Sequence, residues 1–497
     1  MDSVVEAKRK QPASGIAAEA EAPEARRIEI VESLYEKRRE IYPRAKIGDS
    51  LGWFQKWRWA MIWVTQIVFY GLPWLAWNGR QAVLFDLAAR KFYIVGLVLW
   101  PQDVVFLSAL LIIAALSLFL FTAAGGRLWC GYACPQTVYT EIFMWIERKI
   151  EGDRARRMAL DKQPMSPRKF ALKSAKHAAW IAVAFWTGFT FVGYFTPIRE
   201  LGGEIMAAQI GGWSAFWILF YGFATYGNAG WMREQVCKYM CPYARFQSAM
   251  FDQDTLIVTY DASRGEPRAY LSKKGDNRVE DRRARGEGDC VDCGLCVQVC
   301  PTGIDIRNGL QYECIGCAAC IDACNHVMGR SGLPRHLIRY STQHALRDGL
   351  TRAQMWQRVL RPRVLIYAAI LLALVVALVV ALVLRVPLKV DVIRDRGALA
   401  REVDEGQVEN VYRLQVMNTT EAPQTYAVTA RGLPGLAVAS DREFEVPPAA
   451  TRSIVLRLRA PAAEVSPGSH RVSIEVQSQA QREIAVREST TFLGLRR

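Results

Sequence analysis

The sequence predicts a multi-domain membrane protein that combines an α-helical transmembrane bundle, a cysteine-rich central segment and an all-β C-terminal domain. Three patterns lead to this prediction. Apolar stretches of about 20 residues, long enough to cross a bilayer, recur in the first half of the chain and once more near its last quarter. Two runs of closely spaced cysteines precede the last of these stretches, and after it apolar and polar residues alternate with a period of two. A chain of 497 residues is long enough for several domains.

Five stretches are expected to cross the membrane as helices, and the last of them holds 21 consecutive uncharged residues. They are Trp59–Asn78, Val104–Ala124, Ala175–Phe195, Gly212–Trp231 and Val364–Leu384. The formal net charge of +15 is concentrated beside these stretches and not on a basic surface with interleaved aromatic residues. Membrane lipid is therefore an expected partner and nucleic acid is not.

The basic residues predict how the spans are oriented. Glu147–Lys176 holds ten Lys and Arg residues, whereas Thr196–Ile210 holds only Arg199. Because cytoplasmic loops carry an excess of Lys and Arg, we expect the first of these segments on the cytoplasmic side. With five spans, the N-terminus and Pro242–Arg363 then lie in the cytoplasm, and the chain after Leu384 lies on the far side.

Two segments outside the spans have no regular pattern. Met1–Leu51 is charged and lacks the apolar segment of a signal peptide, so that we expect a largely disordered cytoplasmic N-terminus. Arg80–Asp103 joins a short amphipathic stretch, Ala82–Arg90, to about ten apolar residues, Phe92–Pro101, which are too few to cross a bilayer. We expect a re-entrant or interfacial segment on the outer face. A spanning segment is the alternative, and it would move every later element to the opposite side.

The central cysteine runs have the spacing of a bacterial two-cluster ferredoxin. They read Cys290-x2-Cys293-x2-Cys296-x3-Cys300-Pro301 and Cys314-x2-Cys317-x2-Cys320-x3-Cys324. In such ferredoxins three cysteines of a run ligate one 4Fe-4S cluster and the fourth ligates the other. We therefore predict an electron carrier with two 4Fe-4S clusters, the first ligated by Cys290, Cys293, Cys296 and Cys324 and the second by Cys300, Cys314, Cys317 and Cys320. A zinc site needs fewer cysteines, and a reducing cytoplasm disfavours a disulfide scaffold.

A different cysteine motif follows the second and the fourth expected spans. Cys130-x3-Cys134-Pro135 and Cys237-x3-Cys241-Pro242 form an internal repeat at the cytoplasmic edge. On a helix, the two cysteines of one motif would lie at positions i and i+4 on the same face. Proline disfavours helix at the residue before it, so that Cys134 and Cys241 are expected at a helix end or kink.

The four motif cysteines could be apolar fillers, form disulfides or bind a metal ion. Positions i and i+4 of a helix have Cβ atoms about 5 to 6 Å apart, whereas a disulfide needs about 3.5 to 4.5 Å. Thiolates suit Cu(I), and the four thiols are therefore a candidate copper site. Met144, Met232 and Met240 could add thioether ligands, although most such methionines are core residues. His177, at the cytoplasmic end of the third span, is a further candidate ligand or a solvated interface residue.

Several other cofactors are disfavoured by the sequence. Only His177 of the five histidines lies in an expected span, whereas a bis-imidazole haem needs two at depth. The chain has neither the C-x-x-C-H motif of covalent haem nor a G-x-G-x-x-G or P-loop motif, so that no dinucleotide or ATP site is expected.

The chain after Leu384 is expected to form an antiparallel immunoglobulin-like sandwich, because its period-two runs are separated by Asn, Gly and Pro turns. The runs are Leu388–Val392, Val411–Val416, Thr425–Val428, Arg452–Leu458 and Arg471–Val476. The sandwich contains no cysteine. The expected domains are thus residues 1–51 (N-terminus), 52–241 (membrane domain), 242–363 (ferredoxin-type domain), 364–384 (fifth helix) and 385–497 (sandwich).

The order of these elements resembles the CcoG/FixG/RdxA family of cytochrome c oxidase accessory proteins. The resemblance is carried by Leu128–Thr137, Cys237–Gln247 and Gly309–Cys320, and it extends over nearly the whole chain. The membrane half is also similar to membrane polyferredoxins of the NapH and NosR type, from which the fifth span and the sandwich distinguish it. Asn325, where ferredoxins commonly have proline, departs from the pattern and puts the local turn in doubt.

Membership in this family would imply a protein of the bacterial inner membrane that acts in the assembly of cbb3-type cytochrome c oxidase. The resemblance implies reduction of Cu(II) to Cu(I) for the copper centre of the oxidase. Its partners would be a cytoplasmic electron donor, copper ions, and oxidase assembly factors or copper chaperones. Electrons would pass from the clusters to copper at the candidate catalytic residues Cys130, Cys134, Cys237 and Cys241. The sandwich, in the periplasm, would dock a partner.

Two other functions remain compatible with the sequence. One is a generic membrane electron conduit between a cytoplasmic donor and a quinone or an outer acceptor. The other is an assembly scaffold whose clusters only sense the redox state.

Overall fold

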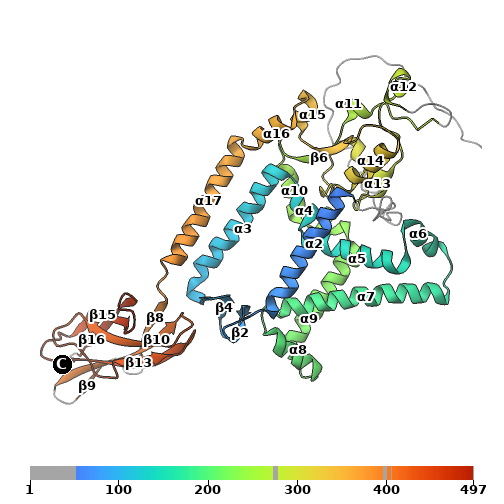
Figure 1. The fold of residues 1–497 in the computed structure, drawn as a ribbon. Coiled ribbons are helices and arrows are strands. Elements are labelled where there is room, and N and C mark those ends of the chain that lie inside the picture. Colours follow the sequence, from blue (N-terminus) through green and yellow to red (C-terminus); the bar gives the residue numbers. More distant parts are fainter. Residues whose placement is uncertain (1–51, 273–277, 396–399, 404–405, 496–497) are drawn as a thin grey trace, which may run out of the picture.

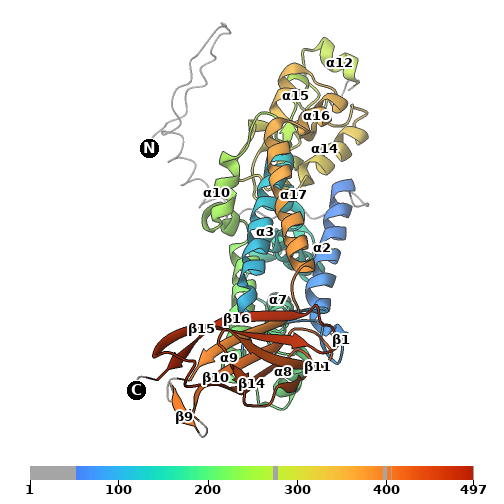
Figure 2. The ribbon, with the colours of Figure 1, turned by 90° about the vertical axis from the view of Figure 1, so that its left-hand side faces the viewer.

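The computed structural model describes residues 52–272, 278–395, 400–403 and 406–495. The expected disordered segment Met1–Leu51 lies outside the described residues. The described chain is elongated. The cysteine-rich segment lies at one end, the β-sandwich lies at the other, and long helices connect them (Figures 1 and 2).

Two helices are long and apolar enough to cross a membrane. One is the 3-10 turn η3 (Pro101–Asp103) continued by α3 (Val104–Gly125), the other is α17 (Pro362–Val383), and both coincide with expected spans. The two helices pack against each other, yet hardly any of their apolar residues is buried within the protein. Lipid would remove this apolar surface from water. The protein is therefore membrane-associated.

Three further helices occupy the other expected spans, with different bounds. They are α2 (Trp53–Gly71), α7 (Pro167–Val192) and α9 (Gly212–Thr225), which continues as the π-helix η4 (Tyr226–Met232). Among the described helices only α3 and α17 combine the length and hydropathy of a span, because α2 and α7 carry charged residues in their first halves and α9 has 14 residues. The expected span Trp59–Asn78 is wrong at both ends, since the chain leaves the helix before Pro73 and turns into strands.

The segment Arg80–Asp103, which was expected to be re-entrant or interfacial with a span as the alternative, forms small antiparallel sheets and contains no spanning helix. Strands β1 (Ala76–Trp77) and β2 (Arg80–Gln81) form a hairpin, and a three-stranded sheet follows. Its strands are β3 (Val83–Asp86), β4 (Lys91–Ile94) and β5 (Leu97–Leu99). Branched and aromatic residues favour strands, and the Asp86 carboxylate stabilises the turn by accepting a hydrogen bond from the Ala89 amide (2.8 Å).

The cysteine-rich segment is a compact unit that packs on the N-terminal end of α2. Its strands β6 (Ile257–Tyr260) and β7 (Ile338–Ser341) pair antiparallel and bring the two ends of the segment together. The Asp322 carboxylate accepts hydrogen bonds from the amides of Phe54 (3.3 Å) and Gln55 (2.9 Å) at the start of α2. A carboxylate at a helix N-terminus satisfies free amides and complements the helix dipole. These two hydrogen bonds connect the cysteine-rich segment to the membrane half.

Shorter helices complete both parts. In the membrane half they are η2 (Leu72–Trp74), α4 (Leu128–Tyr132), α5 (Pro135–Glu151), α6 (Arg154–Lys162), α8 (Ile198–Met206), η5 (Val236–Met240) and α10 (Pro242–Ala249). In and after the cysteine-rich segment they are α11 (Ala262–Gly265), α12 (Val279–Ala284), α13 (Leu295–Gln298), η6 (Ile306–Asn308), α14 (Ala319–Arg330), α15 (Gln343–Asp348) and α16 (Arg352–Val359).

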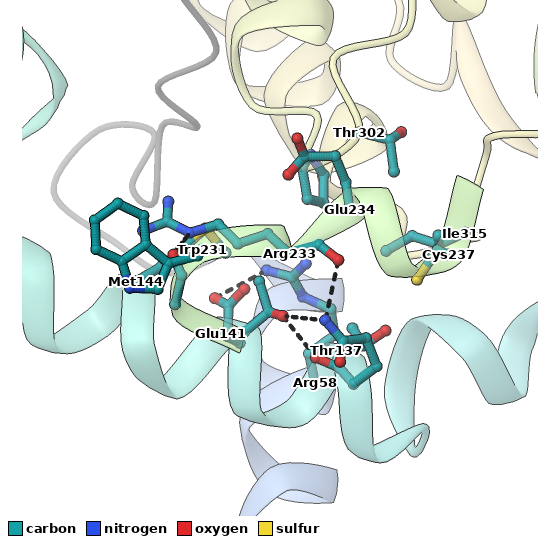
Figure 3. A pocket seen from close by; sticks show the side chains of 14 residues that line it. Arg58, Thr137, Glu141, Met144, Trp231, Arg233, Glu234, Cys237, Thr302 and Ile315 are labelled. Atoms are coloured by element: carbon teal, nitrogen blue, oxygen red, sulfur yellow. Dashed lines mark hydrogen bonds and ion pairs between the residues drawn. The ribbon is translucent and has the colours of Figure 1, made fainter. Parts of the chain in front are cut away.

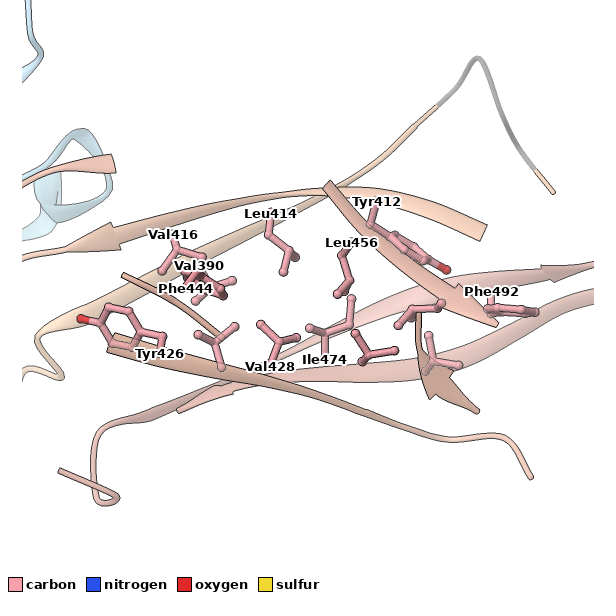
Figure 4. Close-up of a cluster of buried hydrophobic side chains, with 14 of the residues drawn as sticks. Val390, Tyr412, Leu414, Val416, Tyr426, Val428, Phe444, Leu456, Ile474 and Phe492 are labelled. Atoms are coloured by element: carbon pink, nitrogen blue, oxygen red, sulfur yellow. The ribbon is translucent and has the colours of Figure 1, made fainter. Parts of the chain in front are cut away.

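The C-terminal domain is an antiparallel two-sheet sandwich, as the period-two pattern predicts. One sheet has the order β12-β14-β10-β8, with β9 paired to β10, and the other has the order β13-β11-β15-β16. The strands are β8 (Leu388–Arg394), β9 (Arg401–Val403), β10 (Gln407–Asn418), β11 (Gln424–Arg431), β12 (Ala437–Val438), β13 (Glu443–Val446), β14 (Thr451–Pro461), β15 (Gly468–Ser478) and β16 (Ala485–Gly494). Tyr412, Leu414, Leu456, Ile474 and Phe492 fill the space between the sheets (Figure 4). The five predicted runs are confirmed as strands, whereas β9, β12, β13 and β16 are short or mostly polar and escaped the pattern.

The sandwich is docked on the β1–β5 segment through a buried carboxylate. Asp103 accepts hydrogen bonds from the Trp100 amide (3.0 Å) and from Arg385 Nη2 (2.6 Å), and it also pairs with Lys389. Next to this group, Val98 and Trp100 pack against Met417 of the sandwich. The linker after α17 and the first strand of the sandwich are thereby held against the N-terminal end of α3.

Asp103→Asn should loosen this docking. The substitution leaves Arg385 and Lys389 without their counter-charge, and removal of one partner from a buried ion pair costs about 3 to 5 kcal/mol. We expect faster trypsin cleavage after Arg385 and Lys389 in the full-length protein. Glu475→Gln is the control, because its pair with Arg487 lies within the sandwich, with 56% of the Arg487 side chain accessible, and contributes at most about 1 kcal/mol. Equal cleavage rates in the two variants would contradict the role of Asp103.

Candidate metal centres

Four cysteines of the central runs line one cavity. They are Cys290, Cys293, Cys296 and Cys324. Gly294 adopts the left-handed conformation (φ 64°) that ends the first loop and starts α13, and this helix carries Cys296. Cys293 is the exposed member of the set, whereas Cys290 and Cys296 are buried. One edge of this cavity therefore reaches the protein surface.

The other four cysteines of the runs line a second cavity, together with Val258, Ile304 and Ile306. They are Cys300, Cys314, Cys317 and Cys320, and Cys296 of the first cavity also contributes to the wall of the second. Helix α14 contributes to both cavities, because Cys320 and Cys324 lie one turn apart on it. The structure thus brings together the same two sets of four that the ferredoxin spacing predicts as ligands.

The helix α14 also explains why Asn325 can stand where ferredoxins commonly have proline. The helix continues through this residue to Arg330, and the Asn325 side chain accepts a hydrogen bond from the His336 amide (2.8 Å). The amide side chain thereby fixes the following loop without the turn that proline would start.

The chemistry of both cavities fits iron–sulfur clusters. Burial raises the pKa of Cys296, Cys314 and Cys324 to about 12, so that a thiolate is stable there only when a cation shares its charge. Within the described residues, no three Cys, His, Asp or Glu side chains close around a single ion. Thiols spread around a cavity suit a group with several metal atoms, each bound by one thiolate, better than they suit a zinc ion.

The C-x3-C-P motifs do not place their cysteines on one helix, and the i, i+4 expectation is wrong. Cys130 lies in α4, whereas Cys134 is extended (ψ 128°) and caps α5 before Pro135. In the second motif Cys237 lies in the π-helix η5, and Cys241 is extended (ψ 108°) before Pro242 of α10. The expected helix boundary at the second cysteine is confirmed, because the proline excludes helical backbone at the residue before it.

The two motifs nevertheless converge. Burial raises the pKa of Cys130 to about 12, and the charges of Cys134, Cys237 and Cys241 raise it further. The same is true of Cys237, whose pKa burial and the charges of Cys134 and Cys241 raise to about 11. Cys130, Cys134, Cys237 and Cys241 thus lie near one another, although among the described residues no three such side chains close around a single ion, and we call this set the four-thiol centre. The buried Gln247 supports it by accepting a hydrogen bond from Cys130 Sγ (3.4 Å).

The four-thiol centre adjoins the second cysteine cavity. A Cβ atom on Gly131 would lie 2.9 Å from the carbonyl carbon and oxygen of Gly316, which stands between Cys314 and Cys317. From the other motif, Lys238 Nζ donates to the carbonyl oxygen of Thr302 (2.9 Å), two residues after Cys300. Each C-x3-C-P motif therefore contacts a ligand loop of the second cavity.

A further cavity adjoins the four-thiol centre and the ligand loops of the second cavity (Figure 3). Cys237, Thr302 and Ile315 line it on the side of the centres, and Arg58 and Glu141 line the opposite wall. Arg58 pairs with Glu141 (3.3 Å), and Arg233 pairs with Glu147 (2.7 Å). Glu147 is shared, because it also binds Arg157 and Lys176.

The other candidate copper ligands do not all lie at this cavity. Met144 lines this further cavity, whereas 57% of Met240 is exposed. His177 Nδ1 bonds the hydroxyl of Tyr226 (3.0 Å), and its ring stacks on Trp231. His177 is therefore engaged by the aromatic residues of η4.

The sequence did not reveal the residues that join the four-thiol centre to the second cavity. Gly131, Gly316, Lys238 and Arg127 act through contacts between segments far apart in the chain. A single sequence contains no local signal for such contacts. The one available hint was the glycine inside each of the stretches Cys130–Cys134 and Cys314–Cys317.

Two cysteine-lined cavities, with a thiol centre beside the second of them and apolar helices, define a membrane-associated iron–sulfur protein for electron transfer. Family models agree with this class. A 4Fe-4S dicluster domain matches residues 232–343, a 4Fe-4S binding domain matches residues 107–152, and the IG-like fold at the C-terminal of FixG matches residues 378–495. The predicted two 4Fe-4S clusters and the immunoglobulin-like sandwich are thereby confirmed.

Related proteins identify the family. The chain is 40% identical to the nitrogen fixation protein FixG of Rhizobium meliloti, over 81% of each chain. It is 38% identical to protein RdxA of Cereibacter sphaeroides, over 86% of this chain and 90% of RdxA. Protein RdxB of the same organism is 37% identical, over 93% of this chain and 98% of RdxB. The chain belongs to the CcoG/FixG/RdxA family.

Gly131→Ala should separate the four-thiol centre from the second cavity. The added methyl group meets the Gly316 backbone, and such overpacking costs about 1 to 3 kcal/mol. We expect a lower thermal midpoint and partial loss of iron in the purified protein. Gly203→Ala in α8 is the control, because its Cβ would meet no atom within 4 Å and alanine favours a helix by about 1 kcal/mol. If Gly131→Ala were as stable as Gly203→Ala, the contact would not constrain the site.

Proposed function

We propose that this protein is a copper reductase that acts in the assembly of cbb3-type cytochrome c oxidase. Cu(II) is the substrate, and it gains one electron to leave as Cu(I). A one-electron carrier in the cytoplasm loses that electron. The observation that carries the reductase proposal is the contact of both C-x3-C-P motifs with the ligand loops of the second cavity. The link to the oxidase rests on the family resemblance.

The two sets of cysteines are assigned as cluster ligands. The outer cluster site consists of Cys290, Cys293, Cys296 and Cys324, and the inner cluster site consists of Cys300, Cys314, Cys317 and Cys320. When bound, 4Fe-4S clusters supply one-electron carriers. The exposure of Cys293 supports an electron donor that docks at the outer site. The burial of Cys317 and the contact of the neighbouring Gly316 with Gly131 of the membrane half support the inner site as the one nearer to copper.

The four-thiol centre is the proposed copper site. Soft thiolates prefer Cu(I) over harder ions, and the buried thiols need a cation before they ionise. In the adjoining cavity Arg58 is paired with Glu141, and Met144 offers a thioether there. The proposed catalytic residues are accordingly Cys130, Cys134, Cys237 and Cys241.

The proposed topology has five spans in the bacterial inner membrane. These are α2, α3, α7, α9 with η4, and α17. Support comes from the separation of the cysteine-rich segment and the sandwich at opposite ends of α3 and α17 (Figure 2). The ten basic residues of Glu147–Lys176 support a cytoplasmic position for the end that holds the clusters. The sandwich would then face the periplasm and dock an assembly factor or a copper chaperone.

Replacement of all four thiols of the four-thiol centre by alanine tests the copper site. We expect Cu(I) affinity and the rate of Cu(II) reduction to fall by about 100-fold or more, because even loss of residues around metal ligands costs about 10- to 100-fold. Iron content should stay at that of the unaltered protein. Unchanged copper reduction in this variant would contradict the proposed copper site and favour a generic electron conduit to a quinone or an outer acceptor.

Cys293→Ala and Cys317→Ala test whether electron transfer is required. Each removes one proposed ligand, from the outer and the inner site respectively, and should abolish one cluster signal in spectra of the reduced protein. We expect cells with either variant to lose cbb3 oxidase activity when copper is scarce. Normal oxidase assembly without the clusters would instead favour a structural scaffold.

A further inference from the structure

Arg127 lies between the inner cluster site and the four-thiol centre. It follows the end of α3 and caps α4, three residues before Cys130. Its guanidinium donates to the carbonyl oxygen of Cys314 (3.1 Å) and to those of Tyr312 and Ala244. These bonds fix one buried positive charge on the ligand loop of the inner site and on α10, the helix that follows Cys241.

The charge of Arg127 has no acidic partner among the residues that the structure describes. Its side chain forms none of their ion pairs, and Nε has no hydrogen-bond partner there. Other buried arginines differ, since Arg58 pairs with Glu141 (3.3 Å) and Arg157 pairs with Glu147 (2.9 Å). A buried charge without a counter-charge is costly. The structure therefore calls for negative charge close to Arg127.

The groups that can supply this charge are thiolates. Arg127 donates to the carbonyl oxygen of Cys314 (3.1 Å), and it caps α4, the helix that holds Cys130. Both cysteines are metal ligands in the proposed function. One guanidinium thus lies on the ligand loop of the inner site and at the start of the helix of the first C-x3-C-P motif.

The arginines that contact the outer site have carboxylate partners. Arg307, which lines the cavity, is paired with Asp305 (2.7 Å) and with Asp292. Arg282, which donates to the carbonyl oxygen of Cys290 (3.3 Å), is paired with Glu287 (3.5 Å). The inner site differs, because it holds Arg127 without an acidic partner among the described residues.

We propose that Arg127 is a counter-charge that raises the reduction potential of the inner cluster above that of the outer cluster. An added electron makes the inner site more negative, and a fixed positive charge in a dry interior stabilises that state. Electrons then move inward, toward copper. Arg127 is a positioning residue, and its role rests on the ligand assignment of the proposed function.

A redox titration of the full-length protein, followed by electron paramagnetic resonance, tests this role. In Arg127→Gln, the equilibrium for sharing one electron between the clusters should shift about tenfold toward the outer cluster, which is 59 mV for a one-electron couple. Arg127→Lys retains the charge and should retain most of the potential difference. Arg157→Gln is the matched control, because this equally buried arginine has a carboxylate partner, and it should leave both potentials unchanged.

A second variant covers the case in which Arg127→Gln fails to assemble its clusters. The half-buried Phe251 ring lies 6.0 Å from the guanidinium, and Phe251→Glu would give Arg127 a carboxylate partner. We expect this variant to lower the potential of the inner cluster as well. An unchanged inner potential in an assembled Arg127→Gln or Phe251→Glu variant would overturn the proposal. Failure of the unaltered protein to reduce copper would refute the proposed function, while leaving these potential shifts measurable.

Discussion

The backbone contact between Gly131 and Gly316 is the constraint on which the arrangement of the redox centres depends. A side chain on Gly131 would meet the Gly316 backbone, and one on Gly316 would meet the Arg127 backbone. The contact brings the turn of the first C-x3-C-P motif against the loop between Cys314 and Cys317. Lys238 does the same for the second motif through Thr302. The four thiols and the inner cluster site are thus parts of one packed unit, although they belong to different halves of the chain.

Buried charges organise the molecule around this unit. The Asp322 carboxylate caps α2 and fixes the cysteine-rich segment to the membrane half. At the opposite end, Asp103 binds Arg385 and Lys389 and holds the sandwich on the β1–β5 segment. Burial of single charges would be unfavourable, so that each pair selects one relative position of two domains. Arg127 and Lys238 are exceptions in the described chain, since both are buried and bind backbone carbonyl oxygens beside the inner site instead of a carboxylate.

Much of the fold was predictable from the sequence because its signals are local. Runs of apolar residues marked α3 and α17, period-two alternation marked the sandwich, and the spacing of eight cysteines marked two clusters. The bounds of α2 and the strands of Arg80–Asp103 were missed. The stretch Phe92–Pro101 is apolar in either case, and only its pairing with neighbouring strands and its contact with Met417 of the sandwich distinguish a sheet from a membrane segment.

The sequence by itself determined which atoms can bind metal, because thiols at fixed spacings are a property of the chain. It also determined the class of protein through the combination of these spacings with apolar helices. The tertiary structure decided how the centres are ordered. The proximity of the four-thiol centre to the inner site, the exposure of Cys293 and the isolated charge of Arg127 all depend on contacts between residues more than a hundred positions apart. Such contacts form only when several segments pack together, and no local pattern of residues encodes them.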